Sequence, residues 1–158
     1  MKKLIATLLI LLMPSCLVSC GDPATTIFNA EKYSKVSAET LVSELGEPDT
    51  KDPYPLNGYQ LTLYAYNTDS AYIEFILKND EVVRIHYFSN DPISFSSDDD
   101  LYSIFGITPG GNISQTKDTG TVVEYQSINN KVGGLTIQDI TDGSFKTAYI
   151  TFNWKYFG

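Results

Sequence analysis

The chain has 158 residues and a mass of 17.5 kDa, with 42% hydrophobic, 13% aromatic and 19% charged residues. This length and composition fit one globular domain or two small ones, and they exclude a disordered chain and a large multidomain enzyme. Eleven basic residues against nineteen acidic residues give a net charge of −8 at pH 7. A surface of that sign repels nucleic acid, so we expect no DNA or RNA partner.

The first twenty residues resemble the signal peptide of a bacterial lipoprotein. A basic start is followed by an uncharged apolar run over residues 4–13, which is too short to span a bilayer. Small residues then precede Cys20, as in a lipobox. The resemblance implies a lipoprotein signal peptide over residues 1–19, cleavage before Cys20, attachment of lipid (palmitate included) to its thiol, and a protein anchored on the extracytoplasmic side of the cell membrane. The alternative is an ordinary secretory signal with an incidental cysteine.

Cysteine usage limits the chemistry of the mature domain. Cys16 and Cys20 are the only cysteines, so that cleavage and lipidation leave no free thiol. A structural disulfide, a thiolate metal site and a cysteine nucleophile are therefore excluded. Cleavage also removes two lysines and makes the net charge more negative, from −8 to −10, with nine basic and nineteen acidic residues left. Residues 20–33 contain the lipidated cysteine and a polar stretch with a proline, which we predict to be a flexible tether.

Residues 34–90 are predicted to form one helix and three strands. Ser37 is a suitable N-cap, while Gly46 and the proline that follows it end a helix over residues 37–45. Apolar and polar residues then alternate as they do in strands. These strands are predicted at residues 59–66, 71–78 and 81–88.

Residues 91–158 repeat this order of elements. Ser97 and Gly106 stand at the same spacing as Ser37 and Gly46 and predict a second helix over residues 97–105. Three more strands are predicted at residues 121–128, 132–140 and 146–156. We therefore predict an α+β fold, in which two tandem helix-plus-three-strand repeats form an antiparallel sheet with the helices on one face. The alternative is that two amphipathic helices resemble each other by chance.

Residues 36–48 resemble a known helix-to-turn signature. Their sequence, V-S-A-E-T-L-V-S-E-L-G-E-P, is similar to that of the SmpA/OmlA (BamE) lipoproteins, where a hydroxyl residue opens the helix and Leu-Gly-x-Pro closes it. Residues 61–63 and 80–85 also resemble strands of that family. The doubling of such a unit is similar to the beta-lactamase inhibitory protein architecture, in which two helix-plus-sheet repeats form a concave sheet that grips a partner. The resemblance implies this fold type and a protein-binding role.

Few residues indicate catalysis or metal binding. His86 is the only histidine, and no neighbouring motif supplies a nucleophile or an orienting acid. We therefore favour a packed or solvent-facing histidine over a general base. Asp98, Asp99 and Asp100 lie where acids complement a helix N-terminus, and they lack the D-x-D-x-D-G spacing of a calcium loop. We expect no catalytic residue, no metal and no cofactor, and thus no enzyme.

The sheet face opposite the helices is predicted to be open to solvent and rich in tyrosine. The residues predicted to bind a partner on that face are Tyr64, Tyr66, Tyr72, Arg84, His86 and Tyr149. Tyrosine and arginine are enriched where proteins bind one another, because both offer a broad contact area and a polar group. An equally open interpretation is that tyrosine simply suits exposed strand positions.

Three classes of function remain. The first, which we favour, is a non-enzymatic lipoprotein of the cell envelope that is held to the membrane by Cys20. It would bind another envelope or extracellular protein through the open sheet face. The second is a lipoprotein that binds a small molecule or glycan on the same aromatic residues. The third is an envelope hydrolase that uses carboxylates or His86, which would need a cleft with converging acids. The negative charge of the chain favours a basic partner.

Overall fold

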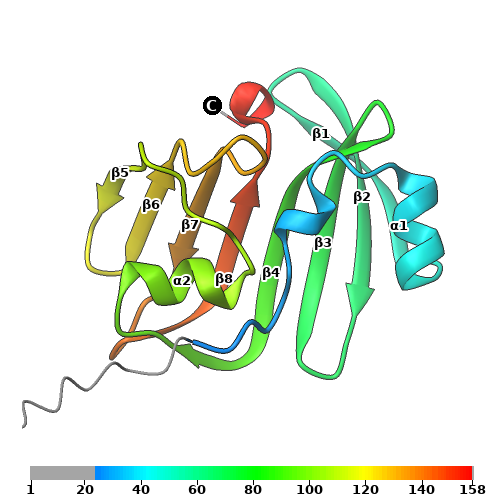
Figure 1. Cartoon of the computed structure of the whole chain (residues 1–158). Helices are drawn as coiled ribbons and strands as arrows, with labels where there is room; N and C mark the ends of the chain where they lie inside the picture. The colour runs from blue at the N-terminus through cyan, green and yellow to red at the C-terminus, as the bar shows by residue number, and fades with distance from the viewer. Residues whose placement is uncertain (1–23, 158) are drawn as a thin grey trace, which may run out of the picture.

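The computed structural model describes residues 24–157, which form one eight-stranded antiparallel sheet with two α-helices on one face (Figure 1). The strands follow the order β1-β2-β3-β4-β8-β7-β6-β5, so that β4 and β8 meet at the centre. Their bounds are Thr50–Leu56 (β1), Tyr59–Asn67 (β2), Ala71–Lys78 (β3), Glu81–Ser94 (β4), Ser114–Asp118 (β5), Val122–Gln126 (β6), Gly134–Gln138 (β7) and Ser144–Thr151 (β8). The helices are α1 (Ala38–Leu45) and α2 (Asp98–Ile104), with short 3-10 helices η1 (Glu31–Tyr33) and η2 (Trp154–Tyr156). No helix in the described part of the chain has the length and apolar character needed to cross a membrane.

Both predicted helices are confirmed, and their ends follow from capping residues. The Ser37 hydroxyl accepts a hydrogen bond from the Thr40 backbone N–H at 3.1 Å, which satisfies a free donor at the start of α1. Gly46 ends α1 with a φ of 86°, a left-handed conformation that glycine adopts without a steric penalty. Ser97 and Asp100 form a reciprocal capping box at the start of α2.

The predicted fold class is wrong, because each helix is followed by four strands instead of three. The two strands that the prediction omitted, β1 and β5, lie at the two edges of the sheet. Pro53 and Pro55 argue against a strand in sequence, but an edge strand tolerates them because one of its sides needs no backbone donors. Every residue of β5 is exposed, so this strand has no apolar alternation that could reveal it.

The sheet is continuous across the predicted boundary between the two repeats. Strand β4 is fourteen residues long. It pairs with β3 on one side and with β8 on the other. The predicted division of the domain into residues 34–90 and 91–158 therefore falls inside a single strand.

The structure also corrects the resemblance to the SmpA/OmlA (BamE) lipoproteins. Residues 36–48 do form a capped helix and a turn, but capping and stop residues recur in many unrelated helices. The strands after this turn form half of one eight-stranded sheet and not the first of two tandem helix-plus-three-strand units. The similarity to the beta-lactamase inhibitory protein depended on that doubling, so it is wrong for the same reason.

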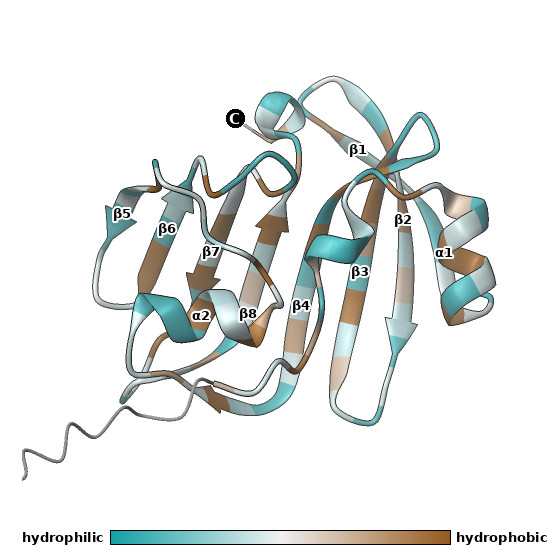
Figure 2. Ribbon diagram, in the orientation of Figure 1, coloured by the Kyte–Doolittle hydropathy of each residue, from teal (hydrophilic) through white to brown (hydrophobic). Residues whose placement is uncertain are grey.

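The main core lies between the sheet and the helices. Figure 2 shows apolar residues alternating with polar ones along the central strands. The largest side chains that are fully buried are Phe75, Phe105, Phe145, Leu41, Ile76, Ile85, Leu101, Ile104, Ile128, Leu135, Ile137 and Ile150. All of them except Ile76 belong to the cluster on the helix side. Burial of this apolar surface is the main driving force for the fold.

The N-terminal segment before α1 belongs to this core. The backbone N–H groups of Ile27 and Ala30 donate to the carbonyl groups of Ile104 and Phe105 at 3.0 and 2.9 Å. The ring of Phe28 lies against those of neighbouring core residues, and Ala30 is fully buried. The predicted tether over residues 20–33 therefore ends earlier than expected, before Ile27. Residues 20–23 lie outside the described part of the chain.

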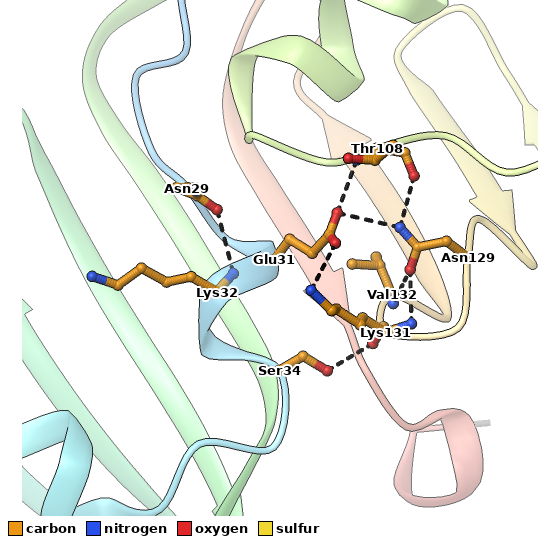
Figure 3. Close-up of polar contacts among 8 residues, drawn as sticks. All are labelled: Asn29, Glu31, Lys32, Ser34, Thr108, Asn129, Lys131 and Val132. Atoms are coloured by element: carbon orange, nitrogen blue, oxygen red, sulfur yellow. Dashed lines mark hydrogen bonds and ion pairs between the residues drawn. The ribbon is translucent and has the colours of Figure 1, made fainter.

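A largely buried carboxylate fixes this segment to the loops of the β5–β8 half (Figure 3). Glu31 Oε2 accepts hydrogen bonds from the Thr108 backbone N–H at 2.9 Å and from the Asn129 side chain at 3.3 Å. Its Oε1 lies 3.2 Å from Lys131 Nζ. Burial favours the neutral acid, but the bonds from Thr108, Lys131 and Asn129 outweigh it and hold the pKa of Glu31 below its usual value. Glu31 is thus ionised at neutral pH and joins the segment to both loops.

Candidate partner-binding face

The sheet face away from the helices, called the open face below, carries four of the six predicted partner-binding residues. These four are Tyr72, Arg84, His86 and Tyr149. Along each strand they alternate with residues that are buried on the helix side, as the pleat of a sheet requires. Nothing in the structure shows a partner on this face, so their role stays a prediction.

The prediction is wrong for Tyr64 and Tyr66, which lie on the helix-covered face. Directly paired residues of an antiparallel ladder share a face, and these two tyrosines pair with Phe75 and Ile73 of the core. Their exposed fractions are only 6% and 7%. The Tyr66 hydroxyl donates to the Gly46 carbonyl at 3.3 Å, and burial raises the pKa of Tyr66 to about 12. Neither residue is available to a partner.

A second, smaller apolar cluster covers the β1–β3 end of the open face. Its buried members are Leu61, Ile76 and Val83, and the partly buried residues packed against them include Tyr54, Leu63, Tyr156 and Phe157. Strand β8 ends at Thr151, and the remaining chain turns across this face, contrary to the predicted strand over residues 146–156. A hydrogen bond of 3.3 Å from the Asn57 side chain to the Tyr156 carbonyl holds the C-terminal segment there.

The register of the strands places five side chains in one row across the middle of the open face. In order from β3 to β6 they are Glu74, His86, Tyr149, Thr136 and Glu124. The row crosses the central pair of strands, β4 and β8. His86 and Tyr149 are far apart in the sequence and yet are in contact here, which no local pattern could predict.

His86 is a buried, neutral member of this row. Its exposed fraction is 8%, and its Nδ1 lies 2.8 Å from Glu74 Oε2. Burial lowers the pKa of His86 despite the opposing effect of Glu74, whereas the bond from His86 lowers the pKa of Glu74. Because the ionised Glu74 has no proton to give, His86 Nδ1–H is the donor. The ring of Tyr149 meets the imidazole edge-on with the centroids 4.8 Å apart.

The stability of the protein should fall between pH 7 and pH 5. In the unfolded chain His86 titrates near its ordinary pKa of 6.5, and burial keeps its folded pKa lower. The unfolded state therefore binds more protons in this range, so stability is complete above pH 6.5 and is lost as the pH falls, by at most about 1.4 kcal/mol per pH unit. Urea unfolding at pH 7.5 and 5.5 measures the difference. His86→Gln should reduce it, and an equal difference in the variant would contradict the assignment.

Arg84, the only arginine of the chain, lies beside this row between two aromatic rings. Its guanidinium carbon is 5.0 Å from the centroid of Tyr149 and 4.6 Å from that of Phe157. Within residues 24–157 it forms no ion pair, and its buried Nε–H has no acceptor. Burial lowers the pKa of Arg84, yet a guanidinium keeps its charge at neutral pH.

A groove with a volume of about 560 Å³ opens beside Arg84. Its walls come from β1, from the C-terminal segment and from strands β4–β8, and they include Tyr54, Lys117, Trp154 and Phe157. The groove thus combines aromatic surface with two of the few cationic side chains of an acidic protein.

Sequence reasoning missed the part of Trp154 in this groove, because it placed the residue on a last strand facing the core. In the structure Trp154 begins η2, whose N-cap Asn153 accepts a hydrogen bond from the Lys155 backbone at 3.1 Å. A Cβ added at Gly134 would lie 2.5 Å from Trp154 Cζ2, so only glycine lets the indole approach β7 this closely. Asn153 and the adjacent glycines Gly133 and Gly134, at the start of β7, are the sequence signals for this arrangement.

Of the three acids at the start of α2, Asp100 acts as a capping residue, in line with the preferred interpretation. Asp100 Oδ2 accepts the backbone N–H groups of Ser96 and Ser97 at 2.8 and 3.1 Å. Asp98 accepts the hydroxyl of Tyr125 at 2.5 Å. Acids here also complement the partial positive charge of the helix N-terminus.

Two arrangements typical of catalytic sites, a metal-binding cluster and a histidine bonded to a hydroxyl group, do not occur among the described residues. Across residues 24–157, no group of three or more His, Cys, Asp or Glu side chains is placed to hold a metal ion. In the same range, His86 makes its only side-chain hydrogen bond to Glu74, and no hydroxyl group is bonded to its ring. The predicted lipid site, Cys20, lies outside this range.

No protein-family model matches the chain, and no curated protein matches it. A cysteine-rich secretory protein from Staphylococcus aureus Mu50 aligns with a TM-score of 0.48 and 11% identity, over 84% of this chain and 47% of that one. An extracellular protein containing an SCP domain, from Bacillus anthracis str. Ames, aligns with a TM-score of 0.45 and 14% identity over the same shares of the two chains. The chain spans about half the length of these structures.

Proposed function

We propose that this protein is a non-enzymatic, lipid-anchored extracytoplasmic protein that binds another envelope or extracellular protein through the open face. The observation that supports this most is the groove beside Arg84, lined by aromatic and cationic side chains. The other face of the sheet is already occupied by α1, α2 and the N-terminal segment. The open face is therefore the broad surface of the sheet that remains for a partner.

The composition of this face suits binding between proteins. Tyr149, His86 and Phe88 form a cluster of edge-on rings with centroids 4.8 to 6.3 Å apart. Aromatic side chains held in this way lose little conformational entropy when they contact a partner. They stand on paired strands at the centre of the sheet, so that the binding surface exists before the partner arrives.

The buried hydrogen bond between His86 and Glu74 supports a binding role rather than a catalytic one. A general base needs a free nitrogen within reach of a substrate proton and a pKa near neutrality. His86 gives one nitrogen to Glu74, its exposed fraction is 8%, and the rings of Tyr54 and Tyr149 flank it. In this setting the pair holds Tyr149 and the adjacent rings in place.

Site-specific photocrosslinking of the full chain in its own cells tests the proposal. A photoreactive phenylalanine analogue at position 72 or 149 on the open face should capture a partner protein. The same analogue at the exposed helix positions 39 and 99 is the matched control and should capture none. Crosslinks from the helix positions alone, or from no position, would overturn the proposal.

A small molecule or glycan is the second candidate for this face. The groove of about 560 Å³ lies within the range of small-ligand sites, roughly 300–1,000 Å³. The indole of Trp154 and the ring of Tyr54 line it, and both can stack on a sugar ring. Absence of protein crosslinks together with binding of a glycan that Tyr54→Ser abolishes would favour this function over the first.

A further inference from the structure

We propose that Arg84 binds a carboxylate group of the partner protein, and that this carboxylate lies in the groove. The inference deepens the proposed function and rests on it for the source of the carboxylate. An unpaired cation at a partly buried position is unfavourable unless other interactions compensate for the hydration that it loses. The two aromatic rings beside Arg84 compensate in part, because their faces attract a guanidinium. Neither ring accepts the buried Nε–H.

The two carboxylates of the row beside Arg84 are held by other residues. Glu74 accepts the bond from His86 at 2.8 Å. Glu124 Oε1 accepts hydrogen bonds from the Thr116 hydroxyl at 2.6 Å and the Gln126 side chain at 3.0 Å. Neither acid lies within 4 Å of the guanidinium as an ion pair in the described structure. No described residue therefore supplies Arg84 with a carboxylate acceptor.

Two further polar groups without partners lie on or beside the strand row that runs from Arg84 through Thr151 to Gly134. Thr151 pairs with Arg84 across β4 and β8, and it pairs with Gly134 on its other side. The Thr151 hydroxyl is buried and has no hydrogen-bond partner among the described residues. The Trp154 indole, which lies against Gly134, has a buried Nε1–H that is equally without an acceptor. Unpaired groups are rare in protein interiors, and the Nε–H of Arg84 and the Nε1–H of Trp154, whose residues both line the groove, mark an incomplete site there.

The chemistry favours a carboxylate over a more highly charged anion. A guanidinium offers a planar fork of N–H donors that matches the two oxygens of a carboxylate. A phosphate dianion would also fit the fork, but the carboxylate of Glu124 lines the same groove and would repel it more strongly. The negative charge of the whole chain favours a basic partner, so we expect an acidic side chain set among basic residues on the partner surface.

The test uses two NMR signals that need no assignment by mutation. The chain has one arginine and one tryptophan, so Arg84 Nε–H and Trp154 Nε1–H each give a single signal of their type. The sample is the ¹⁵N-labelled mature chain from residue 20, with Cys20→Ser to prevent lipidation. It is titrated with N-acetylglutamate methylamide, and separately with the neutral N-acetylglutamine methylamide. We expect both signals to move with the carboxylate at millimolar concentrations, and the amide to bind at least about tenfold more weakly.

Three variants separate the role of Arg84 from general effects of charge. Arg84→Gln should abolish the carboxylate-dependent shift of the Trp154 signal. Arg84→Lys keeps the charge but loses the planar fork and should weaken binding. Lys35→Gln removes the same charge from an exposed site before α1, and it should bind the carboxylate like the parent. The remaining backbone signals report whether each variant is folded.

The possible outcomes distinguish this site from the proposed function. Signals that do not move with the carboxylate, that move equally with the amide, or that still move in Arg84→Gln would overturn the site, while open-face crosslinks could still support protein binding. Carboxylate-dependent shifts without any open-face crosslink would keep the site and overturn the protein partner. The ligand would then be a free carboxylate.

Discussion

Replacing Phe75 with alanine should lower the free energy of unfolding by about 3–5 kcal/mol. Phe75 is fully buried at the centre of the helix-side core. Its ring lies 5.1 Å from that of Tyr33, 6.4 Å from that of Phe28 and 5.7 Å from that of Tyr66, measured between centroids. Truncation removes the buried ring and leaves a cavity that these packed neighbours fill only partly. Urea unfolding monitored by tryptophan fluorescence measures the loss.

The matched control is Phe88→Ala on the neighbouring strand. Phe88 pairs with Tyr72, lies on the open face and is only partly buried. The same chemical change should therefore lower the free energy of unfolding by less than about 1.5 kcal/mol, because less apolar area leaves contact with protein. Equal losses in the two variants would show that the sheet has its core on both faces, contrary to the structure.

Cys20→Ala should transfer nearly all of the protein from the membrane fraction to the soluble fraction. The proposed anchor is the lipid on this thiol, and each buried methylene of an acyl chain contributes about 0.8 kcal/mol to membrane binding. No helix among residues 24–157 could replace it as a membrane span. Fractionation of the producing cells, followed by immunoblotting, measures the distribution.

Cys16→Ala is the control for that experiment, because Cys16 lies within the segment proposed to be removed. It should leave the protein in the membrane fraction. Retention of Cys20→Ala in the membrane would contradict the anchor, and release of both variants would instead indicate a defect in the signal peptide.

Local signals in the sequence were sufficient for the helices. Ser37 and Gly46 act through their immediate neighbours, the first by capping and the second by its left-handed backbone, so the residue types alone predict both ends of α1. The same holds for Ser97 and Asp100 in α2. The inner strands β2, β3 and β4 were also found from their alternation, although β4 continues further than predicted.

The faces of the strands needed information that is not local. Strand β2 has large apolar or aromatic residues on both sides, Leu61 and Leu63 on one and Tyr64 and Tyr66 on the other. Its alternation therefore identifies a strand but not the side that is buried. The pairing of Tyr64 with Phe75 decides the question, and that pairing depends on the turn between β2 and β3.

The candidate site was only partly predictable for the same reason. Arg84 and His86 were recognised on one face of one strand, and that placement holds. Phe157 reaches Arg84, and Trp154 reaches the groove, only because the chain leaves β8 at Thr151 and crosses the open face. This change of direction after β8 depends on tertiary contacts. The sequence did not reveal it, because residues 146–156 alternate throughout as a strand would.

The prolines of β1 make the two ends of the sheet unequal toward other polypeptides. Pro53 and Pro55 stand two residues apart in β1, so their backbone nitrogens point to the same side of the strand. Because the hydrogen bonds between β1 and β2 are intact, that side is the free edge of the sheet, away from β2. An incoming strand would therefore find two missing donors along this rim. Addition of a further strand, from a neighbouring copy or from a misfolded chain, is therefore disfavoured at β1. The edge formed by β5 is the one that remains open to it.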